Sequence, residues 1–280
     1  MNGKLYVVGT PIGNMGDMSP RAVEVLSGVD FIAAEDTRVS LKLLNRFGIQ
    51  KPLVSYFEHN KSIKTEKLLA RLQNGENCAI VTDAGMPAIS DPGEDLVRAC
   101  RENGIEVESV PGPSAVITAL AASGLATGRF CFEGFLSVNK SSRAAHLAEL
   151  KDERRTMVFY EAPHKLLATL GDMYKVFGDR KTAFCRELTK LHEQVLIMPL
   201  SQAVAYYTEN PPKGEFVLVI EGKIKEESEQ FSLWDAARLA RRLADEGSSL
   251  SAAAKEAASV SGFKKGDIYR ILIEREEENG

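Results

Sequence analysis

The sequence contains only four cysteines, and no two of them have the short spacing of a metal-binding or redox motif. They stand at Cys78, Cys100, Cys131 and Cys185. This scatter excludes a Cys-x-x-Cys zinc site and provides no disulfide framework. We see no other cluster of metal ligands and expect no bound metal. Reduced, mostly buried thiols in a cytoplasmic protein fit this pattern best.

The chain also lacks any apolar run of the length that a membrane-spanning helix requires. The most apolar candidate, 115–128, is interrupted by Ser123, Gly124 and Thr127. The first residues do not combine a charged region with an apolar one, so no signal peptide is expected. These absences predict a cytoplasmic protein that is not associated with a membrane.

A strongly basic composition is missing as well, because the formal net charge is −4. Any nucleic-acid site must therefore be local and cannot come from a global positive field. The chain has 280 residues, of which 44% are hydrophobic. This is enough apolar material for one large domain or two smaller ones.

What the sequence does contain is a strand, a shaped loop and a helix start in immediate succession at 79–93. The apolar run Cys78–Val81 predicts a buried parallel strand. Asp91 is predicted to cap the next helix, with Pro92 at the first helical position and Glu94 completing a capping box. Ligands of open α/β sheets bind beyond the carboxyl ends of the strands. Taken alone, however, such a loop fits an ordinary connection equally well.

Strand-like and helix-like segments alternate along most of the chain, which predicts an α/β protein with a mostly parallel N-terminal sheet. We expect an N-terminal domain at 1–123 and a second domain with a mixed sheet at 124–222. In the second domain, Val195–Leu200 and Phe216–Ile220 are expected to pair antiparallel. The charged residues 223–231 are interpreted as a linker.

Residues 232–280 predict three short helices, with Ser232 and Asp235 capping the first. Their expected ranges are Leu233–Ala244, Ser251–Ser259 and Gly266–Glu276. Such an arrangement is typical of a helix-turn-helix-like extension. A small bundle packed on the main body is the alternative.

Four loops that contain glycine or proline follow predicted strands in order, at 9–14, 83–87, 111–115 and 159–163. Their order and spacing resemble the tetrapyrrole methylase superfamily, whose members use S-adenosylmethionine as the methyl donor. Together with Ala34–Arg38 and Tyr56–Asn60, they are most similar to its small-subunit (16S) ribosomal RNA cytidine 2′-O-ribose methyltransferase I family. This resemblance covers about residues 5–222, and the family's C-terminal extension is matched by 232–277.

The resemblance implies a two-domain tetrapyrrole-methylase-like fold that methylates the 2′-oxygen of a cytidine ribose in small-subunit ribosomal RNA, acting as a homodimer. Porphyrin-modifying relatives usually carry Gly-x-Gly-Pro-Gly-Asp in the first loop, whereas here Thr10 and Ile12 flank Pro11. This bulkier loop argues against a tetrapyrrole substrate. Methylation of a small molecule such as a tetrapyrrole, or a non-catalytic RNA-binding module, remain the alternatives.

The resemblance also implies a cofactor cleft between the two domains. The residues expected there are Pro11, Asp83, Ala84, Gly85, Ile89, Ser114, Ala115, Tyr160, Glu161, Ala162, Gly214, Glu215 and Phe216. Asp36, His59, Glu161 and Glu187 are candidates to remove the proton of the ribose hydroxyl, because all stand at predicted strand ends. Asp36 equally fits a helix cap that pairs with Arg38, and His59 equally fits a surface histidine.

RNA contacts are expected from cations near the cleft and in the extension, since phosphate contacts position a nucleic acid. The candidates are Arg38, Arg186, Lys190, Lys264, Lys265 and Arg270. A solvated charged face is the alternative for each of them.

Overall fold

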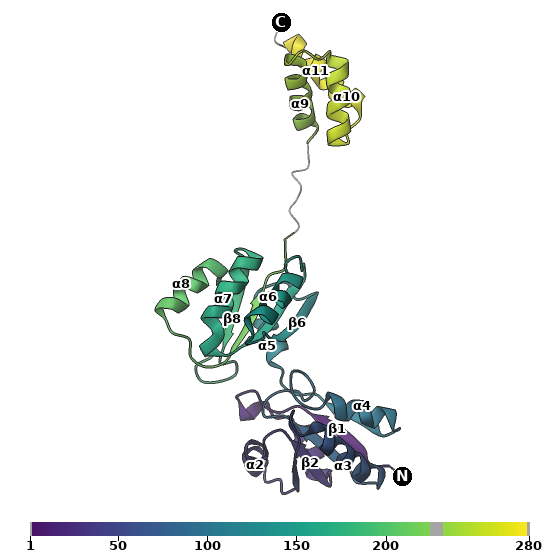
Figure 1. Cartoon of the computed structure of the whole chain (residues 1–280), viewed down its shortest axis with the longest axis vertical. Helices are drawn as coiled ribbons and strands as arrows, with labels where there is room; N and C mark the ends of the chain where they lie inside the picture. The colour runs from purple at the N-terminus through teal and green to yellow at the C-terminus, as the bar shows by residue number, and fades with distance from the viewer. Residues whose placement is uncertain (1, 225–231, 279–280) are drawn as a thin grey trace. The chain divides into compact units, whose positions relative to one another are not determined.

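The computed structural model describes residues 2–224 and 232–278. The chain divides into two compact units, Met1–Lys223 and Ile224–Gly280. The first contains two sheets and the second three helices (Figure 1). Most of the predicted linker, 225–231, lies outside the described residues.

The first sheet has five parallel strands in the order β3-β2-β4-β1-β5, which confirms the predicted parallel sheet. The strands are β1 (Lys4–Val8), β2 (Phe31–Ala34), β3 (Leu53–Ser55), β4 (Cys78–Val81) and β5 (Glu106–Val110). Four helices and a 3-10 turn connect them: η1 (Met15–Asp17), α1 (Pro20–Gly28), α2 (Thr37–Arg46), α3 (Lys61–Gln73) and α4 (Glu94–Glu102). The strands β2 and β4 are completely buried and apolar, as strands covered on both faces must be.

The helices cover both faces of this sheet. Leu26 of α1 and Leu44 of α2 belong to the cluster on one face, and Leu72 of α3 and Leu96 of α4 belong to the cluster on the other. The connection that follows β1 leads to β2 on one side of the β4–β1 pair, whereas the connection that follows β4 leads to β5 on the other side. The strand order therefore reverses between β4 and β1. The carboxyl ends at such a switch point are the ordinary ligand site of open α/β sheets.

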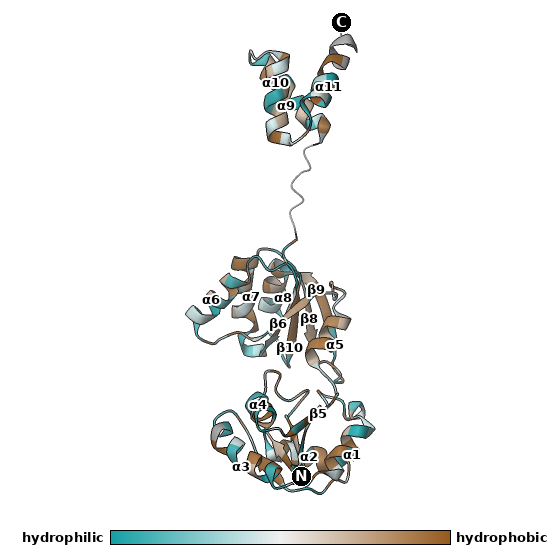
Figure 2. Cartoon of the chain, turned by 90° about the vertical axis from the view of Figure 1, so that its right-hand side faces the viewer, coloured by the Kyte–Doolittle hydropathy of each residue, from teal (hydrophilic) through white to brown (hydrophobic). Residues whose placement is uncertain are grey.

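The second sheet is mixed, in the order β6-β7-β10-β8-β9. Its strands are β6 (Phe130–Phe135), β7 (Thr156–Glu161), β8 (Lys181–Arg186), β9 (Gln194–Pro199) and β10 (Phe216–Ile220). The helix α5 (Ala115–Ala122) packs on one face, while α6 (Lys140–Glu149), α7 (Pro163–Phe177) and α8 (Leu200–Glu209) pack on the other. The central strand β10 is entirely buried. Its residues are apolar, and Figure 2 colours the sheet by hydropathy.

Two sequence predictions are wrong in detail. The strands β9 and β10 do not pair with each other, because β10 is inserted between β7 and β8 and the unpredicted α8 separates it from β9. Asp91 does not cap α4, which begins at Glu94 after Gly93. Gly93 has φ +141°, a conformation that favours glycine, and this sharp turn keeps 91 and 92 in the loop.

The C-terminal unit consists of α9 (Leu233–Asp245), α10 (Leu250–Ser261) and α11 (Lys265–Glu278). The predicted capping box of Ser232 and Asp235 is confirmed. Small side chains let the helices approach closely, since Ala236, Ala240 and Ala254 are completely buried. Gly262, with φ +77°, closes α10 in the left-handed conformation that ends many helices.

None of the helices in the described ranges is both long enough and apolar enough to cross a membrane.

Candidate functional site

A cavity of about 640 Å³ lies at the carboxyl ends of the first sheet and is closed by the second domain. The first domain contributes the loops after β1, β2, β4 and β5. The second contributes the end of β6, the ends of β7 and β8 with the residues that follow them, and the start of β10. The volume is typical of a site for a small molecule or cofactor. A cavity thus lies where the resemblance implies the cofactor cleft, and binding of the cofactor there stays a prediction.

The first and third loops of the cavity are joined through their backbones. Thr10 and Gly85 exchange two hydrogen bonds, with N···O distances of 2.9 and 3.1 Å. The buried Thr10 hydroxyl donates to the carbonyl of Thr82 at 3.1 Å. Gly85 has φ +86°, where a side chain would be strained. A rigid backbone surface therefore forms one wall.

Aromatic rings form the opposite wall. The ring of Tyr160 lies 5.0 Å from that of Phe132 and 5.3 Å from that of Phe135. Burial raises the pKa of Tyr160 to about 12, although a hydrogen bond from the backbone of Val116 favours the ionised form. Tyr160 therefore stays neutral at physiological pH. Phe135 lines the cavity although 57% of it is exposed, so it offers a free aromatic face.

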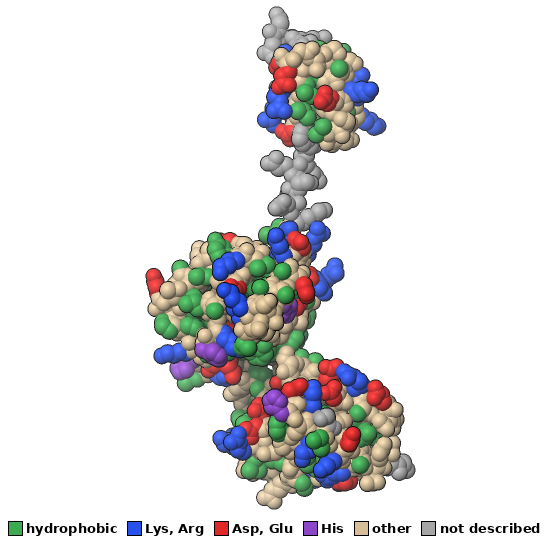
Figure 3. Space-filling view, viewed as in Figure 1, with side chains coloured by type: hydrophobic (Ala, Val, Ile, Leu, Met, Phe, Trp, Pro, Cys, Tyr) green, Lys and Arg blue, Asp and Glu red, His purple; other side chains and the backbone are tan. Residues whose placement is uncertain are grey.

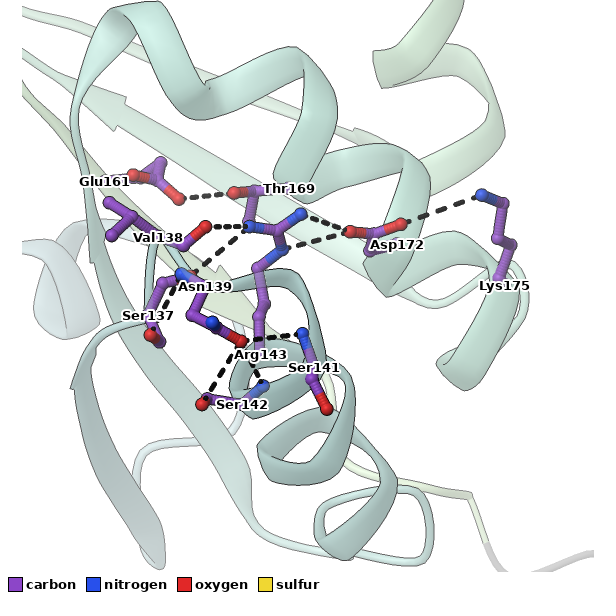
Figure 4. Close-up of polar contacts among 10 residues, drawn as sticks. All are labelled: Ser137, Val138, Asn139, Ser141, Ser142, Arg143, Glu161, Thr169, Asp172 and Lys175. Atoms are coloured by element: carbon purple, nitrogen blue, oxygen red, sulfur yellow. Dashed lines mark hydrogen bonds and ion pairs between the residues drawn. The ribbon is translucent and has the colours of Figure 1, made fainter.

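Polar contacts hold the segments next to these rings, and Figure 4 draws the contacts of Glu161 and of Arg143. The buried carboxylate of Glu161 accepts from the amide of Ala162 at 2.9 Å and from the hydroxyl of Thr169 at 2.5 Å. One helical turn further along α7, Asp172 accepts from Arg143 at 2.8 and 3.0 Å. Both carboxylates are thus held by fixed partners.

Arg143 also holds the loop that follows Phe135. Its guanidinium donates to the carbonyls of Ser137 and Val138 at 3.2 and 3.4 Å. Because α7 anchors Arg143, this loop is tied to the rest of the second domain.

Carboxylates gather on the first-domain side of the cavity. Glu35 accepts from the hydroxyl of Thr82 at 2.6 Å, and Asp83 accepts from the amide of Asp36 at 3.1 Å. Burial, reinforced by the charges of Glu35 and Asp83, raises the pKa of Asp91 to about 6. The same two causes, burial and neighbouring acids, raise the pKa of Asp83. No group of side chains in the described ranges is arranged to hold a metal ion.

All but two of the predicted cofactor residues line this cavity. Those that do are Asp83, Ala84, Gly85, Ile89, Ser114, Ala115, Tyr160, Glu161, Ala162, Glu215 and Phe216. Pro11 is buried and its neighbour Ile12 faces the cavity instead. Gly214 packs against the side chain of Glu187 outside it. Cofactor binding by each residue remains a prediction.

Of the four candidates for the catalytic base, Glu161 lines the cavity, whereas Asp36, His59 and Glu187 do not. Asp36 caps α2 by accepting from the amide of Arg38 at 2.8 Å, and it pairs with the Arg38 guanidinium at 2.7 Å. These hydrogen bonds lower the pKa of Asp36 to about 2, which makes it a weak base. His59 is exposed, with its ring edge-on to Phe57.

Glu187 connects the end of β8 to the start of β10, and residues near both of these strand ends line the cavity. Its carboxylate accepts from the amide of Glu215 and from the ammonium of Lys190, both at 2.9 Å. The Glu215 amide, and then Lys190, lower the pKa of Glu187. This arrangement is that of a positioning residue, and a catalytic role for Glu187 stays a prediction.

The cations that were predicted to contact RNA differ in their exposure and in how far they are already paired within the protein. Arg38 is highly exposed apart from its pairing with Asp36. Arg186 donates to the carbonyl of Lys213 at 2.6 Å, and Lys190 bridges Glu187 and Glu215. In the C-terminal unit, Lys264 and Lys265 are exposed, and Arg270 lies 3.9 Å from Asp267.

Several residues that line the cavity were not predicted from the sequence to do so. Ile12, Glu35, Asp91, Phe135, His164 and Leu188 line the cavity without having been assigned to the cofactor. Glu35 and Asp91 are next to residues that were singled out, so their position after a strand was a usable signal. Phe135 and Leu188 gave none, because an apolar residue at a strand end is indistinguishable from a core residue.

The sequence pattern of the family described as "Tetrapyrrole (Corrin/Porphyrin) Methylases" matches residues 4–204. Solved structures with the same architecture include uroporphyrin-III-C-methyltransferase from Thermus thermophilus, with a TM-score of 0.55 and 22% identity over 78% of this chain and 94% of that one. The methyltransferase CobJ gives a TM-score of 0.58 and 17% identity over 80% of this chain and 97% of that one. These two likenesses show the fold alone.

Curated relatives are much more similar. A protein of Synechocystis is 50% identical over 98% of this chain and 99% of its own length, and one of Escherichia coli O157:H7 is 46% identical over 98% and 96%. A protein of Thermotoga maritima is 47% identical over 79% of this chain and 99% of its own length. All three are named "Ribosomal RNA small subunit methyltransferase I". The chain therefore belongs to the tetrapyrrole methylase family and is a methyltransferase that uses S-adenosylmethionine.

Proposed function

We propose that this protein transfers a methyl group from S-adenosylmethionine to the 2′-oxygen of a cytidine ribose in small-subunit ribosomal RNA. The observation that carries the proposal is the cavity at the switch point of a chain with nearly full-length relatives named for methylation of this RNA. The nucleotide and the oxygen come from the resemblance of the sequence motifs.

The cavity residues fit the methyl donor, which supplies an activated methyl group when bound. The backbone of Ala84 can contact polar groups of the donor without a charged side chain, beside Gly85, whose amide and carbonyl are paired with Thr10. Phe135 and Tyr160 provide aromatic surface for an adenine ring. Asp83 lies in the opposite wall, on the first domain, where its carboxylate suits a ligand that carries positive charges.

Positioning is the main task of such a site, because methyl transfer is an in-line displacement that requires nearly collinear atoms. The backbone pairing of Thr10 with Gly85 and the fixed carboxylate of Glu161 make the two opposing walls rigid. A preformed cavity of this kind holds its ligand without a large loss of conformational freedom.

Recognition of the RNA is assigned to local cations, since acidic and basic side chains are mixed over the face of the first unit drawn in Figure 3. Sequence-specific readout of RNA usually requires an unpaired nucleotide that can be turned out of its helix. We assign the binding of RNA next to the target nucleotide to the C-terminal unit, where Lys264 and Lys265 are exposed. The relative of Thermotoga maritima bears the same name although it matches only 79% of this chain. This favours a role in affinity, rather than in chemistry, for the additional residues.

We further propose that the protein is a homodimer that acts in the cytoplasm, where small ribosomal subunits are found. Apolar side chains support a contact between second domains: Ile197 on the edge strand β9 is 46% exposed, and Leu191 in the preceding loop is 93% exposed. Light scattering on the purified protein tests the dimer, and a monomer at micromolar concentration would contradict it.

The decisive test is a transfer assay with labelled S-adenosylmethionine on small ribosomal subunits and, in parallel, on porphyrinogens. Label in the ribosomal RNA, mapped to one ribose that is unmethylated in cells lacking the protein, supports the proposal. Label only in the porphyrinogen would identify a small-molecule methylase. A chain that binds no donor in calorimetry would instead be a non-catalytic RNA-binding module.

A further inference from the structure

A second hollow, of about 570 Å³, adjoins the cavity on the first domain. It lies between the loop after β3 and the start of α4, and Phe57, Lys61 and Pro92 are among its lining residues. The two hollows share three lining residues, Glu35, Ser90 and Asp91. A ligand group that contacts these three residues can therefore be reached from both hollows.

The loop that carries two of the shared residues has an unusual backbone. Ala88 and Ser90 have φ +68° and +62°, a conformation uncommon for residues other than glycine. The amide of Ala88 donates to the carbonyl of Pro92 at 3.3 Å, which closes the loop on itself. Strain of this kind persists where the surroundings enforce it and is frequent at functional sites. It sets the position of Asp91 relative to both hollows.

The lining of the second hollow indicates what it can accept. Its charged groups are mainly acidic, and its one lysine, Lys61, is already paired with Glu58 at 2.8 Å and with Asp95 at 2.9 Å. A phosphate would be repelled inside this hollow, so it suits an uncharged base and ribose whose flanking phosphodiesters lie outside. Phe57, which is 38% exposed, offers a ring on which a base can stack.

We propose that the second hollow receives the nucleoside to be methylated, and that the carboxylate of Asp91 accepts the proton of its ribose 2′-hydroxyl. The proposal rests on the proposed function, because it requires a ribose as the acceptor. It assigns the donor to the larger cavity and places the reacting atoms at the wall that the two hollows share.

The chemical step balances without any further reactant. A lone pair of the 2′-oxygen forms the new O–C bond, and the methyl carbon–sulfur bond breaks, with its electron pair remaining on sulfur. The sulfonium becomes a neutral thioether. The hydroxyl proton passes to Asp91, which becomes a neutral carboxylic acid and later releases the proton to water.

The surroundings of Asp91 suit this role. Glu35 from the β2 loop and Asp83 from the β4 loop face it with like charges, and the Tyr160 hydroxyl and the Thr82 hydroxyl are its neutral neighbours. On the side of the second hollow, Lys61 and the acids Glu58, Glu94 and Asp95 complete the charged lining. A base with a pKa near 6 is ionised at neutral pH and still more basic than an ordinary aspartate. Below that pH Asp91 is protonated and cannot accept a proton.

The test compares the full-length protein with Asp91→Asn in single-turnover methyl transfer to small ribosomal subunits. We expect the rate to fall by roughly 10²- to 10³-fold, as for loss of a general base. The affinity for S-adenosylmethionine, measured by calorimetry, and the melting temperature should stay close to those of the unmodified protein. Glu102→Gln, at the far end of α4 and outside both hollows, removes one carboxylate from the same domain and should leave the rate unchanged.

The pH profile provides a second measurement that does not depend on the variant. The single-turnover rate of the unmodified protein should rise through an inflection near pH 6, and any residual activity of Asp91→Asn should lack that inflection. A variant rate within threefold of the unmodified protein, or a profile without the inflection in the unmodified protein, overturns the assignment. Complete absence of ribose methylation by the unmodified protein would refute the proposed function itself.

Discussion

A Cβ atom added to Gly9 would lie 2.7 Å from the Cα of Gly112, and one added to Gly112 would lie 2.8 Å from the carbonyl carbon of Gly9. The two glycines follow β1 and β5, and the amide of Gly9 donates to the carbonyl of Val110 at 3.1 Å. The loops beneath the cavity therefore touch backbone to backbone. This contact is possible only because neither residue has a side chain.

Gly112→Ala should destabilise the first unit and weaken donor binding. The added methyl group meets backbone, which cannot rotate away, and overpacking of this kind costs about 1–3 kcal/mol. We expect the melting temperature to fall by several degrees and the dissociation constant for S-adenosylmethionine to rise. Gly28→Ala is the matched control, because a Cβ there has no neighbour within 4 Å. Equal melting temperatures for the two variants would contradict the close contact.

Phe135→Ala should separate donor binding from stability. Phe135 is 57% exposed, so its removal has little effect on the free energy of unfolding, yet its ring covers Tyr160 in the cavity wall. We expect donor affinity to fall by roughly threefold to tenfold. Val138→Ala in the following loop, where Val138 is 72% exposed and does not line the cavity, should leave affinity unchanged. Calorimetry on both variants measures the difference.

Much of the first sheet was predictable, because its strands are short apolar runs with glycine-ended helices between them. The run at 78–81 was predicted at its observed limits. The start of α4 was not, since a capping pattern at 91–94 is a local signal and the observed turn is set by Gly93. Tertiary structure overrode the local preference there.

The second sheet was harder to predict, for two physical reasons. The pairing of β10 with β7 and β8 joins segments distant in sequence, and no local pattern indicates which strand is inserted between which. Helix α8 follows β9 directly at Leu200 without a cap from its own N-cap residue. Its first turn is capped instead by Asp179, which accepts from the amide of Ser201 at 2.8 Å and is distant in sequence, so no local capping pattern separated the helix from the strand. The cavity residues were predictable where family motifs marked them, but Phe135 and Leu188 carry no such mark.

Glu187→Gln should lower stability in a manner that depends on pH. The pKa of Glu187 is lowered in the folded protein, so its ionised form stabilises the fold above its ordinary pKa, and this contribution is lost as the pH falls through the folded value. At pH 7 we expect a loss of about 1 kcal/mol, because the glutamine oxygen can still accept from the amide of Glu215. The difference between the two proteins should shrink as the pH falls below 4.5, the ordinary value. Urea unfolding at pH 7 and pH 4 measures it, and a constant difference would contradict the prediction.

Two substitutions at Asp36 distinguish a helix cap from a catalytic base. Asn retains the oxygen that accepts from the amide of Arg38, whereas Ala removes it. If Asp36 acts as a cap, Asp36→Asn should keep both the melting temperature and the methyl-transfer rate, and Asp36→Ala should lower the melting temperature. A fall of 10²-fold or more in the rate of a stable Asp36→Asn protein would instead support the catalytic role that its sequence position suggested.

If the C-terminal unit binds RNA as proposed, replacing its lysines should change how the affinity for small ribosomal subunits depends on salt. Lys264 and Lys265 stand where α11 begins, and the Lys265 ammonium is engaged only by the hydroxyl of Ser251, at 2.7 Å, among the described residues. If each lysine neutralises one phosphate, the slope of log affinity against log salt should decrease in magnitude by roughly 0.7–0.9 per lysine replaced. The variant with both lysines changed to Ala should bind small ribosomal subunits more weakly at low salt and keep the donor affinity of the unmodified protein. Arg242→Ala is the control, because its guanidinium already lies 4.0 Å from the carboxylate of Glu246. An unchanged slope in the double variant would show that the extension does not contact the RNA through these residues.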